Sequence, residues 1–168
     1  MNEISFRNDI LPLKNELYRL ALRITMDRAE AEDIVQETLI KVWNRRGQWA
    51  EIASMEAFCL TICRNLSLDH MKRAGNKTDP IEESEAGEDE SNPYEQMLMR
   101  NRVEIVRKLI DNLPEKQRTC IQLRDFEGKT YKDIAKIMAV TEEQVKVNIF
   151  RARQAIKQKF QKIEDYGL

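Results

Sequence analysis

A run of acidic residues near the middle of the sequence limits what the chain can fold into. Residues 75–93 read GNKTDPIEESEAGEDESNP, with seven acidic residues, one lysine and one large apolar side chain, Ile81. Such a stretch buries too little apolar surface to offset the conformational entropy lost on ordering. Long structureless loops are also uncommon inside compact domains. We therefore favour a flexible acidic linker between two small domains, residues 1–74 and 94–168, over a solvated loop within one domain.

The segments on either side of this linker have a helix-favouring composition. Only 5 of the 168 residues are glycine and 4 are proline, so the chain has few of the turns that a many-stranded fold needs. Apolar residues recur at helical spacing, for example at Leu13, Leu17, Leu20 and Ile24. We predict an all-α fold of two small helical domains.

Three features of the sequence favour a cytoplasmic protein. No apolar run approaches the roughly 20 residues of a membrane helix. The N-terminus, MNEISFRNDI, lacks the positive flank, apolar centre and small cleavage-site residues of a secretory signal. The 3 cysteines are an odd number, which argues against a disulfide framework.

The second helix of the first domain carries a mixed polar stripe. Asp27 and Glu30 form an N-cap signal, and the helix is expected to run to about Arg46. Opposite its apolar side, the helical period places Asp33, Gln36, Glu37 and Ile40. The stripe is either a solvated face with one apolar residue or a docking surface for a basic partner helix. Spacing alone favours the solvated face.

Cys59, Cys63 and His70 share one side of the third expected helix, so a metal site is geometrically conceivable. The cysteines are flanked by Phe58 and Ile62 on an apolar stripe, where cysteine behaves as a small hydrophobic residue. No fourth ligand lies nearby in the sequence. We favour core packing and predict no metal and no cofactor.

The second domain contains two short helices with separate start signals. Thr130 and Asp133 form the first signal, and Thr141 and Gln144 form the second. Two capped helices joined by a few residues are typical of a helix-turn-helix. The turn carries Ala139, where many such motifs have glycine.

The last helix is expected to have an apolar seam and a basic face. The seam consists of Val145, Ile149, Ala152, Ile156 and Phe160. The opposite face consists of Lys146, Val147, Phe150, Arg151, Gln154 and Lys157. A basic face of this kind suits the major groove of DNA, which is about 12 Å wide and admits one α-helix. A solvated lysine-rich helix is the alternative, and the preceding caps favour DNA binding.

The order of these elements resembles the extracytoplasmic-function (ECF) group of the sigma-70 family. LYRLALRIT, AEAEDIVQETLIKVW and FCLTICRNLSLDHMKR resemble region two of that family. LPEKQRTCIQLRDFEGKTYKDIAKIM and VKVNIFRARQAIK resemble region four. The resemblance implies a promoter-recognition subunit of bacterial RNA polymerase that is not itself an enzyme.

The resemblance also implies roles for side chains of the first domain. In this family the helix that matches residues 29–46 docks on a coiled coil of the largest polymerase subunit, which implies contacts at Asp33, Gln36, Glu37 and Ile40. The −10 element is read by the loop that matches residues 47–55, where a flipped base can be held, and by the next helix. Its matching positions are Arg64, Asn65, Asp69 and Lys72.

In the second domain, the family reads the −35 element in the major groove. The matching positions of the recognition helix are Lys146, Phe150, Arg151 and Arg153. Phosphate contacts, which set register rather than sequence, are implied at Arg118, Lys129, Thr130 and Tyr131. Serine and arginine are frequent in the family where this chain has Val147 and Asn148, which leaves the inherited base preference open.

The implied partners are core polymerase, promoter DNA and an anti-sigma factor, often a membrane-linked one, with no small-molecule substrate. Two other protein classes stay open from the residues. A free-standing helix-turn-helix regulator would dimerise and bind symmetric half-sites alone, whereas a sigma factor needs core enzyme and uses asymmetric sites. An enzyme with a Cys/His metal site would need stoichiometric metal and would lose its function in Cys59→Ala.

Overall fold

The computed structural model describes residues 3–75 and 94–165, called here the first and second parts, and every regular element in them is helical. The first part contains a π-helical turn (Phe6–Ile10), a 3-10 turn (Leu11–Leu13), α1 (Lys14–Thr25), α2 (Arg28–Asn44), a 3-10 segment (Arg46–Glu51) and α3 (Met55–Gly75). The second part contains α4 (Tyr94–Asp111), α5 (Glu115–Ile121), a π-helical turn (Gln122–Phe126), α6 (Tyr131–Met138) and α7 (Glu142–Asp165). The predicted all-α class is confirmed.

The predicted acidic linker, apart from Gly75, lies outside the described residues. None of the helices that the structure describes has the length and apolar character needed to cross a membrane.

Side chains cap the helices at the starts that the sequence predicts. Asp27 Oδ1 accepts a hydrogen bond from the Glu30 amide at 3.1 Å. Thr141 and Gln144 cap each other, since each side-chain oxygen accepts from the other residue's amide, at 3.1 and 2.9 Å. Each cap satisfies backbone N–H groups that a helix leaves without partners in its first turn.

The segment after α2 forms a short 3-10 helix that packs against the end of α2. The α-helix ends at Asn44, two residues before the expected Arg46, and a 3-10 segment follows. Trp49 in that segment is buried, and its indole Nε1 donates to the Val42 carbonyl oxygen at 3.0 Å. The 47–55 stretch is therefore anchored to the end of α2.

Apolar side chains of α1, α2 and α3 form the core of the first part. Cys59 and Cys63 lie fully buried in it, and the Cys63 thiol donates to the Leu17 carbonyl oxygen at 3.3 Å. Burial raises the pKa of both thiols to about 12. Because the thiolate is the reactive form of cysteine, these side chains act as packing residues, as the apolar stripe predicted.

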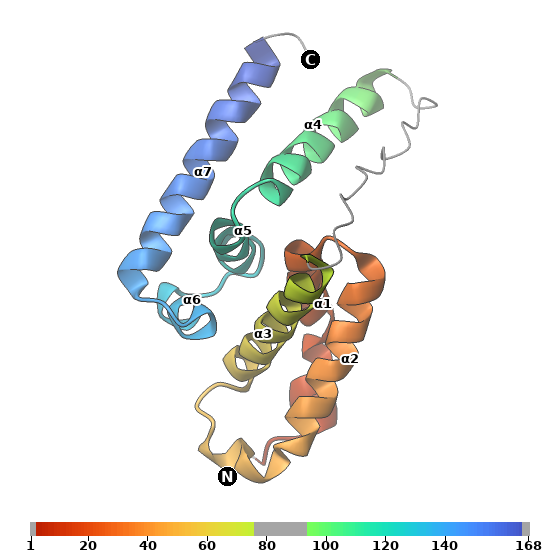
Figure 1. Cartoon of the computed structure of the whole chain (residues 1–168), viewed down its shortest axis with the longest axis vertical. Coiled ribbons are helices and arrows are strands. Elements are labelled where there is room, and N and C mark those ends of the chain that lie inside the picture. Colours follow the sequence, from red (N-terminus) through yellow and green to blue (C-terminus); the bar gives the residue numbers. More distant parts are fainter. Residues whose placement is uncertain (1–2, 76–93, 166–168) are drawn as a thin grey trace.

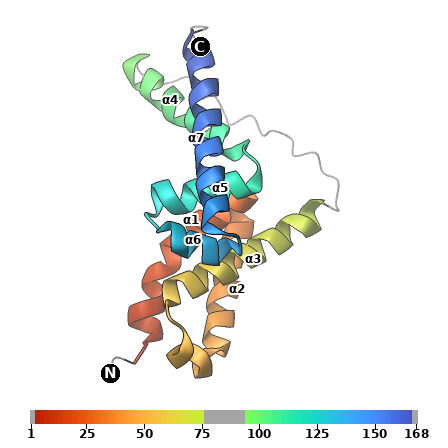
Figure 2. The same ribbon diagram turned by 90° about the vertical axis from the view of Figure 1, so that its left-hand side faces the viewer.

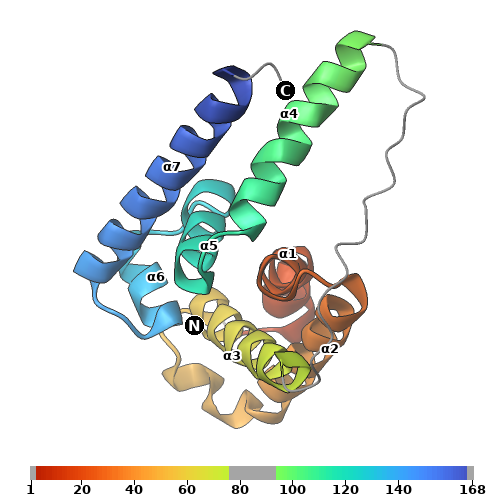
Figure 3. The same ribbon diagram turned by 45° about the horizontal axis from the view of Figure 1, so that its top comes forward.

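The two parts pack against each other. Figure 1 shows α4 and α7 side by side, extending away from the bundle of α1, α2 and α3. Figures 2 and 3 show α5 and α6 at the foot of that pair, where α5 lies against α1 and α6 against α3. Cys120, Leu123, Ile134 and Ile137 of the second part belong to the same apolar core as the first part. We call this contact of α5, α6 and the turn between them with α1 and α3 the closed packing.

The turn of the helix-turn-helix places an alanine in a left-handed conformation. Ala139 follows the last residue of α6 and has a φ of 55°. In this conformation the Val140 amide donates to the Ala135 carbonyl oxygen at 3.0 Å and closes the helix end. The left-handed region costs an L-residue roughly 1–2 kcal/mol, a cost that glycine does not carry.

We therefore expect Ala139→Gly to raise the free energy of unfolding by about 0.5–1 kcal/mol, because relief of backbone strain exceeds the extra unfolded-state entropy of glycine. Urea denaturation followed by circular dichroism measures the change. Glycine at Ala135, inside α6, is the matched control and is expected to destabilise. A lower urea midpoint for Ala139→Gly than for wild type would show that the backbone of Ala139 is not strained.

Candidate nucleic-acid interface

One face of α7 is exposed along the start of the helix, and the opposite face is buried. Val145, Ile149 and Ala152 are buried in the seam, while Ile156 and Phe160 at its far end are half-buried. The exposed face carries Lys146, Val147, Phe150 and Arg151, and Phe150 is 63% exposed. A large aromatic side chain and two cations therefore face outward together on one helix.

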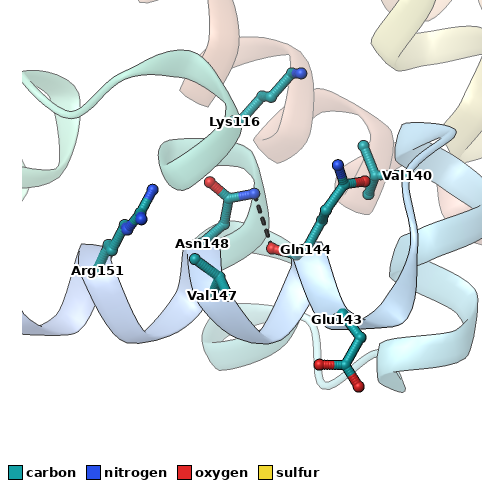
Figure 4. A pocket seen from close by; sticks show the side chains of 7 residues that line it. All are labelled: Lys116, Val140, Glu143, Gln144, Val147, Asn148 and Arg151. Carbon is teal, nitrogen blue, oxygen red and sulfur yellow. Dashed lines mark hydrogen bonds between the residues drawn. The ribbon is translucent and has the colours of Figure 1, made fainter.

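A shallow hollow of about 280 Å³ lies beside this face, between α7 and the start of α5 (Figure 4). Lys116 lines it from α5, and Val147, Asn148 and Arg151 line it from α7. The Asn148 amide nitrogen donates to the Gln144 carbonyl oxygen at 2.9 Å, which fixes the amide plane. Helical periodicity could not identify Lys116 as part of this surface, because a π-helical turn and α6 lie between α5 and α7 along the chain.

Arg153 is held apart from the other three predicted recognition residues by an ion pair. Its Nε and terminal nitrogen donate to the two carboxylate oxygens of Asp125, at 3.2 and 2.5 Å. Asp125 belongs to the π-helical turn that precedes α6. Hydrogen bonding to Asp125 raises the pKa of Arg153.

The four predicted positions on α3 are divided by the closed packing. Asn65, Asp69 and Lys72 are exposed, whereas Arg64 is only 7% exposed. The Arg64 guanidinium contacts the Glu115 carboxylate of α5 at 3.1 Å and the Met138 carbonyl oxygen at 3.4 Å. The structure thus places Arg64 between the two parts of the chain.

The predicted phosphate contacts are also divided. Thr130 is exposed and caps α6, since its hydroxyl accepts from the Asp133 amide at 3.1 Å. The Tyr131 ring lies under the Arg124 guanidinium, with 4.7 Å between the guanidinium carbon and the ring centroid. The Lys129 ammonium lies between two carboxylates, 2.7 Å from Glu16 and 2.6 Å from Glu56.

Arg118 is the most enclosed of the predicted phosphate contacts. It is 5% exposed and donates to the carbonyl oxygens of Asp111 and Leu113 at 3.1 and 3.0 Å. Its second terminal nitrogen donates to the Ile24 carbonyl oxygen at the end of α1, at 3.0 Å. Burial lowers its pKa. In the closed packing the Arg118 side chain donates hydrogen bonds to backbone carbonyl oxygens and does not face solvent.

The polar stripe of α2 borders an apolar hollow. Asp33, Gln36 and Glu37 are exposed, and Ile40 is 59% exposed. Ile40 lines the hollow together with three further apolar side chains, Phe6, Leu39 and Trp43. Phe6 packs edge-on against Trp43 with 5.5 Å between ring centroids. The contribution of Phe6 could not be found from helical periodicity, because it lies on a separate turn.

His70 does not face the cysteines with which the sequence grouped it. Its ring reaches α2, where Nδ1 contacts the Glu30 carboxylate and Nε2 lies 3.7 Å from a Glu37 carboxylate oxygen. Across residues 3–75 and 94–165, no three His, Cys, Asp or Glu side chains converge in a way that could hold a metal ion.

Comparison with known proteins establishes the family. The model of Sigma-70 region 2 matches residues 10–77, and that of Sigma-70, region 4 matches residues 104–156. The chain is 31% identical to the RNA polymerase sigma-H factor of Pseudomonas aeruginosa over 166 residues, covering 91% of this chain and 86% of the relative. It is 32% identical to the ECF RNA polymerase sigma-E factor of Haemophilus influenzae over 146 residues, covering 81% of this chain and 77% of the relative. The chain belongs to the ECF group of the sigma-70 family.

Two solved structures support the fold of this sigma factor. One is the sigma factor RpoE in complex with the anti-sigma factor NepR from Bartonella quintana, with a TM-score of 0.75, 24% identity, and coverage of 94% of this chain and 97% of that one. The other is CnrH in complex with the cytosolic domain of CnrY, with a TM-score of 0.68, 18% identity, and coverage of 95% and 90%.

The family assignment decides between the functions that the sequence left open. The protein is an RNA polymerase sigma factor that acts in promoter-specific transcription initiation. A free-standing helix-turn-helix regulator would not be expected to match both sigma regions in this order.

The contacts of Arg118 predict a large effect on the stability of this sigma factor. Arg118→Ala leaves three carbonyl oxygens without this donor, two of them in buried hydrogen bonds, so we expect the free energy of unfolding to fall by about 2–4 kcal/mol. Urea denaturation measures the change, and Lys116→Ala, an exposed position two residues away, is the control with little expected effect. If Arg118→Ala were as stable as wild type, the hydrogen bonds of Arg118 would not contribute to the stability of the fold.

Proposed function

We propose that this sigma factor reads the −35 element with the exposed face of α7. The observation that carries the proposal is the combination of Lys146, Phe150 and Arg151 on that face, opposite a buried seam. An arginine can bond a guanine edge with two hydrogen bonds, and a phenylalanine can contact a thymine methyl group. Arg153 joins this set if it exchanges Asp125 for DNA.

The hollow beside α7 supports a larger recognition surface than the family motif implies. Val147 and Asn148, the two positions where the sequence departs from the common pattern, both line it. Val147 offers methyl groups for thymine, and the Asn148 amide oxygen is an acceptor for an amino group of a base. We propose that Thr130, Tyr131 and Lys129 contact the phosphate backbone of DNA. Arg118 instead stabilises the fold.

For the −10 element we propose the exposed side of α3 and the segment before it. Asn65, Asp69 and Lys72 offer a donor, acceptors and a cation on one helix, and Arg64 completes the set once it leaves Glu115. Residues 47–55 are the proposed site of a flipped base. The anchoring of Trp49 to α2 supports this assignment, because a fixed loop preorganises a pocket.

Core polymerase is the proposed partner of α2. The exposed carboxylates of Asp33 and Glu37, with Gln36, suit a basic partner helix, and Ile40 continues into the apolar hollow with Phe6 and Trp43. Charge complementarity of this kind steers association, and the apolar area adds affinity. A polar rim around an apolar centre is the usual anatomy of a protein interface.

We also propose an anti-sigma factor as a partner, since RpoE and CnrH are both described in complexes of that kind or with a cytosolic partner domain. The sigma factor acts in the cytoplasm with polymerase and carries no enzymatic activity, cofactor or small-molecule substrate of its own. The polymerase supplies the chemistry. The division into domains at residues 1–74 and 94–168 remains part of this proposal.

Run-off transcription with purified bacterial core polymerase on a genomic library tests the function directly. Reactions with the sigma factor are expected to yield transcripts from a set of asymmetric promoters that core enzyme alone does not use. Binding of the chain alone to symmetric sites, with no transcripts in the presence of core, would contradict the proposal.

At the recognition helix, Arg151→Ala is expected to cost roughly 1–3 kcal/mol of binding free energy at one upstream base pair. The reason is the loss of a two-point contact with a base edge. Transcription from promoters randomised across the upstream element measures the cost by position. Lys162→Ala, an exposed cation near the end of α7, is the matched control. A uniform loss across all sequences would reassign Arg151 to a phosphate.

At α2, the double variant Asp33→Ala with Glu37→Ala is expected to slow association with core polymerase by about tenfold at low salt, because electrostatic steering is lost. Stopped-flow fluorescence measures the rate, and circular dichroism checks the fold. The control is Glu32→Ala with Glu51→Ala, which removes two exposed carboxylates outside the stripe. Equal slowing in both double variants would show an effect of net charge rather than of the stripe.

A further inference from the structure

His70 of α3 is nearly covered, and its ring lies between two carboxylates of α2. The exposed fraction of the side chain is 14%. Nδ1 contacts the Glu30 carboxylate, and Nε2 lies 3.7 Å from Oε2 of Glu37. Nε2 is buried and, among the described residues, has no hydrogen-bond partner. One ring nitrogen is therefore fully engaged, and the other faces a carboxylate that lies just beyond hydrogen-bond distance.

The charge of the ring decides whether both contacts are favourable. A neutral imidazole has one N–H donor and one lone pair, whereas an imidazolium has two donors. An ionised carboxylate can only accept hydrogen bonds. Whichever nitrogen of a neutral His70 ring carries the proton, the other nitrogen presents its lone pair to Glu30 or Glu37. Only the imidazolium attracts both carboxylates, and a small movement of Glu37 would then complete a second hydrogen bond.

The charged groups around the ring come chiefly from α2. Asp33 shares the side of α2 that carries Glu30 and Glu37, because these positions are spaced by one turn of the helix. On α3 itself, the nearest cation by helical register is the exposed Arg73. In the part of the chain that the structure describes, no ion pair joins the ring to α1, to α6 or to the first π-helical turn, which also pack on α3.

We propose that His70 is a positioning residue for the docking of core polymerase, because it controls whether Glu37 is available to the partner. The inference rests on the proposed function, in which Glu37 belongs to the stripe that meets a basic partner helix. The imidazolium draws the Glu37 carboxylate toward α3 and offsets its charge. The neutral ring presents a lone pair to that carboxylate and leaves it free for the partner. Docking is therefore slower when the ring is protonated.

The role of His70 gives docking a pH dependence with a definite sign. Histidine ordinarily changes its charge between about pH 5 and pH 8. As the pH falls through this range, the ring gains a positive charge, so the stripe attracts a basic partner less strongly. As the pH rises, the full negative charge of the stripe returns. His70 is the only histidine among the 168 residues, so no other imidazole of the chain adds to the effect.

Stopped-flow association of the full chain with core polymerase tests the effect on docking. Wild type, His70→Gln and His70→Arg are compared from about pH 5.5 to about pH 8. Glutamine is a neutral donor and arginine a permanent cation, so neither changes its charge in this range. A comparison at equal pH removes the pH dependence of the polymerase itself, and circular dichroism checks that each variant is folded.

Relative to His70→Gln at the same pH, wild type is expected to associate about threefold more slowly at the lowest pH. At the highest pH the two are expected to associate equally fast, because the ring is then neutral. His70→Arg is expected to be slow throughout the range, because its charge is permanent.

A second measurement uses the free wild-type chain, so it does not depend on the folding of any variant. The single histidine gives one set of ring signals in NMR spectra. Nuclear Overhauser contacts between the His70 ring and the side-chain protons of Glu37 are expected at the lowest pH and should weaken as the pH rises. Contacts between the ring and Glu30 are the internal control. They are expected to persist, because Nδ1 can keep its proton for Glu30 in both charge states.

The outcomes separate this inference from the proposed function. Contacts between the ring and Glu37 that do not change with pH would overturn the positioning role. The same pH profile in wild type and His70→Gln, or equal rates for His70→Gln and His70→Arg, would overturn the effect on docking. The proposed function fails instead if the double variant Asp33→Ala with Glu37→Ala associates with core polymerase as fast as wild type. That result would leave the NMR contacts of the free wild-type chain unaffected.

Discussion

The guanidinium group of Arg118 lies between the end of α4 and the end of α1, and its hydrogen bonds hold these two helix ends together. It donates to the connection between α4 and α5 and, across the interface, to the carbonyl oxygen of Ile24 at the end of α1. Carbonyl groups at helix ends have no partner within the helix, so a buried end needs a donor from elsewhere. Around this point the cores of the two parts meet, and Leu123 and Ile134 bury against the first part. The placement of α5 and α6 on α1 and α3 therefore depends on the Arg118 hydrogen bonds and on the apolar core that surrounds them.

The features that local physics determines could be predicted from the sequence. The caps at Asp27, Thr130 and Thr141 form within three residues of each helix start, so short motifs specify them. The seam and face of α7 follow from the period of 3.6 residues, and only its far end, at Ile156 and Phe160, is less buried than the pattern predicts. The grouping of both cysteines in the core has the same origin.

The features that depend on contacts between distant residues could not be predicted in this way. The spacing on α3 places Arg64 on the same helix as Asn65 and Lys72, but only the packing of α5 and α6 decides that Arg64 is covered. The partner of Arg19 lies 108 residues away along the chain. His70 shares a helical side with the cysteines, yet it turns to α2 because carboxylates are there. Periodicity predicts which side a residue takes, and the neighbouring element then determines what it contacts.

The charge pattern of the chain has a structural counterpart in this interface. Each part supplies carboxylates that neutralise a cation of the other: Glu16 and Glu56 face Lys129, and Glu115 faces Arg64. A formal net charge of −1 therefore conceals local charges of opposite sign that pair across the interface. Separating enclosed pairs is costly unless each charge gains a new partner or full hydration.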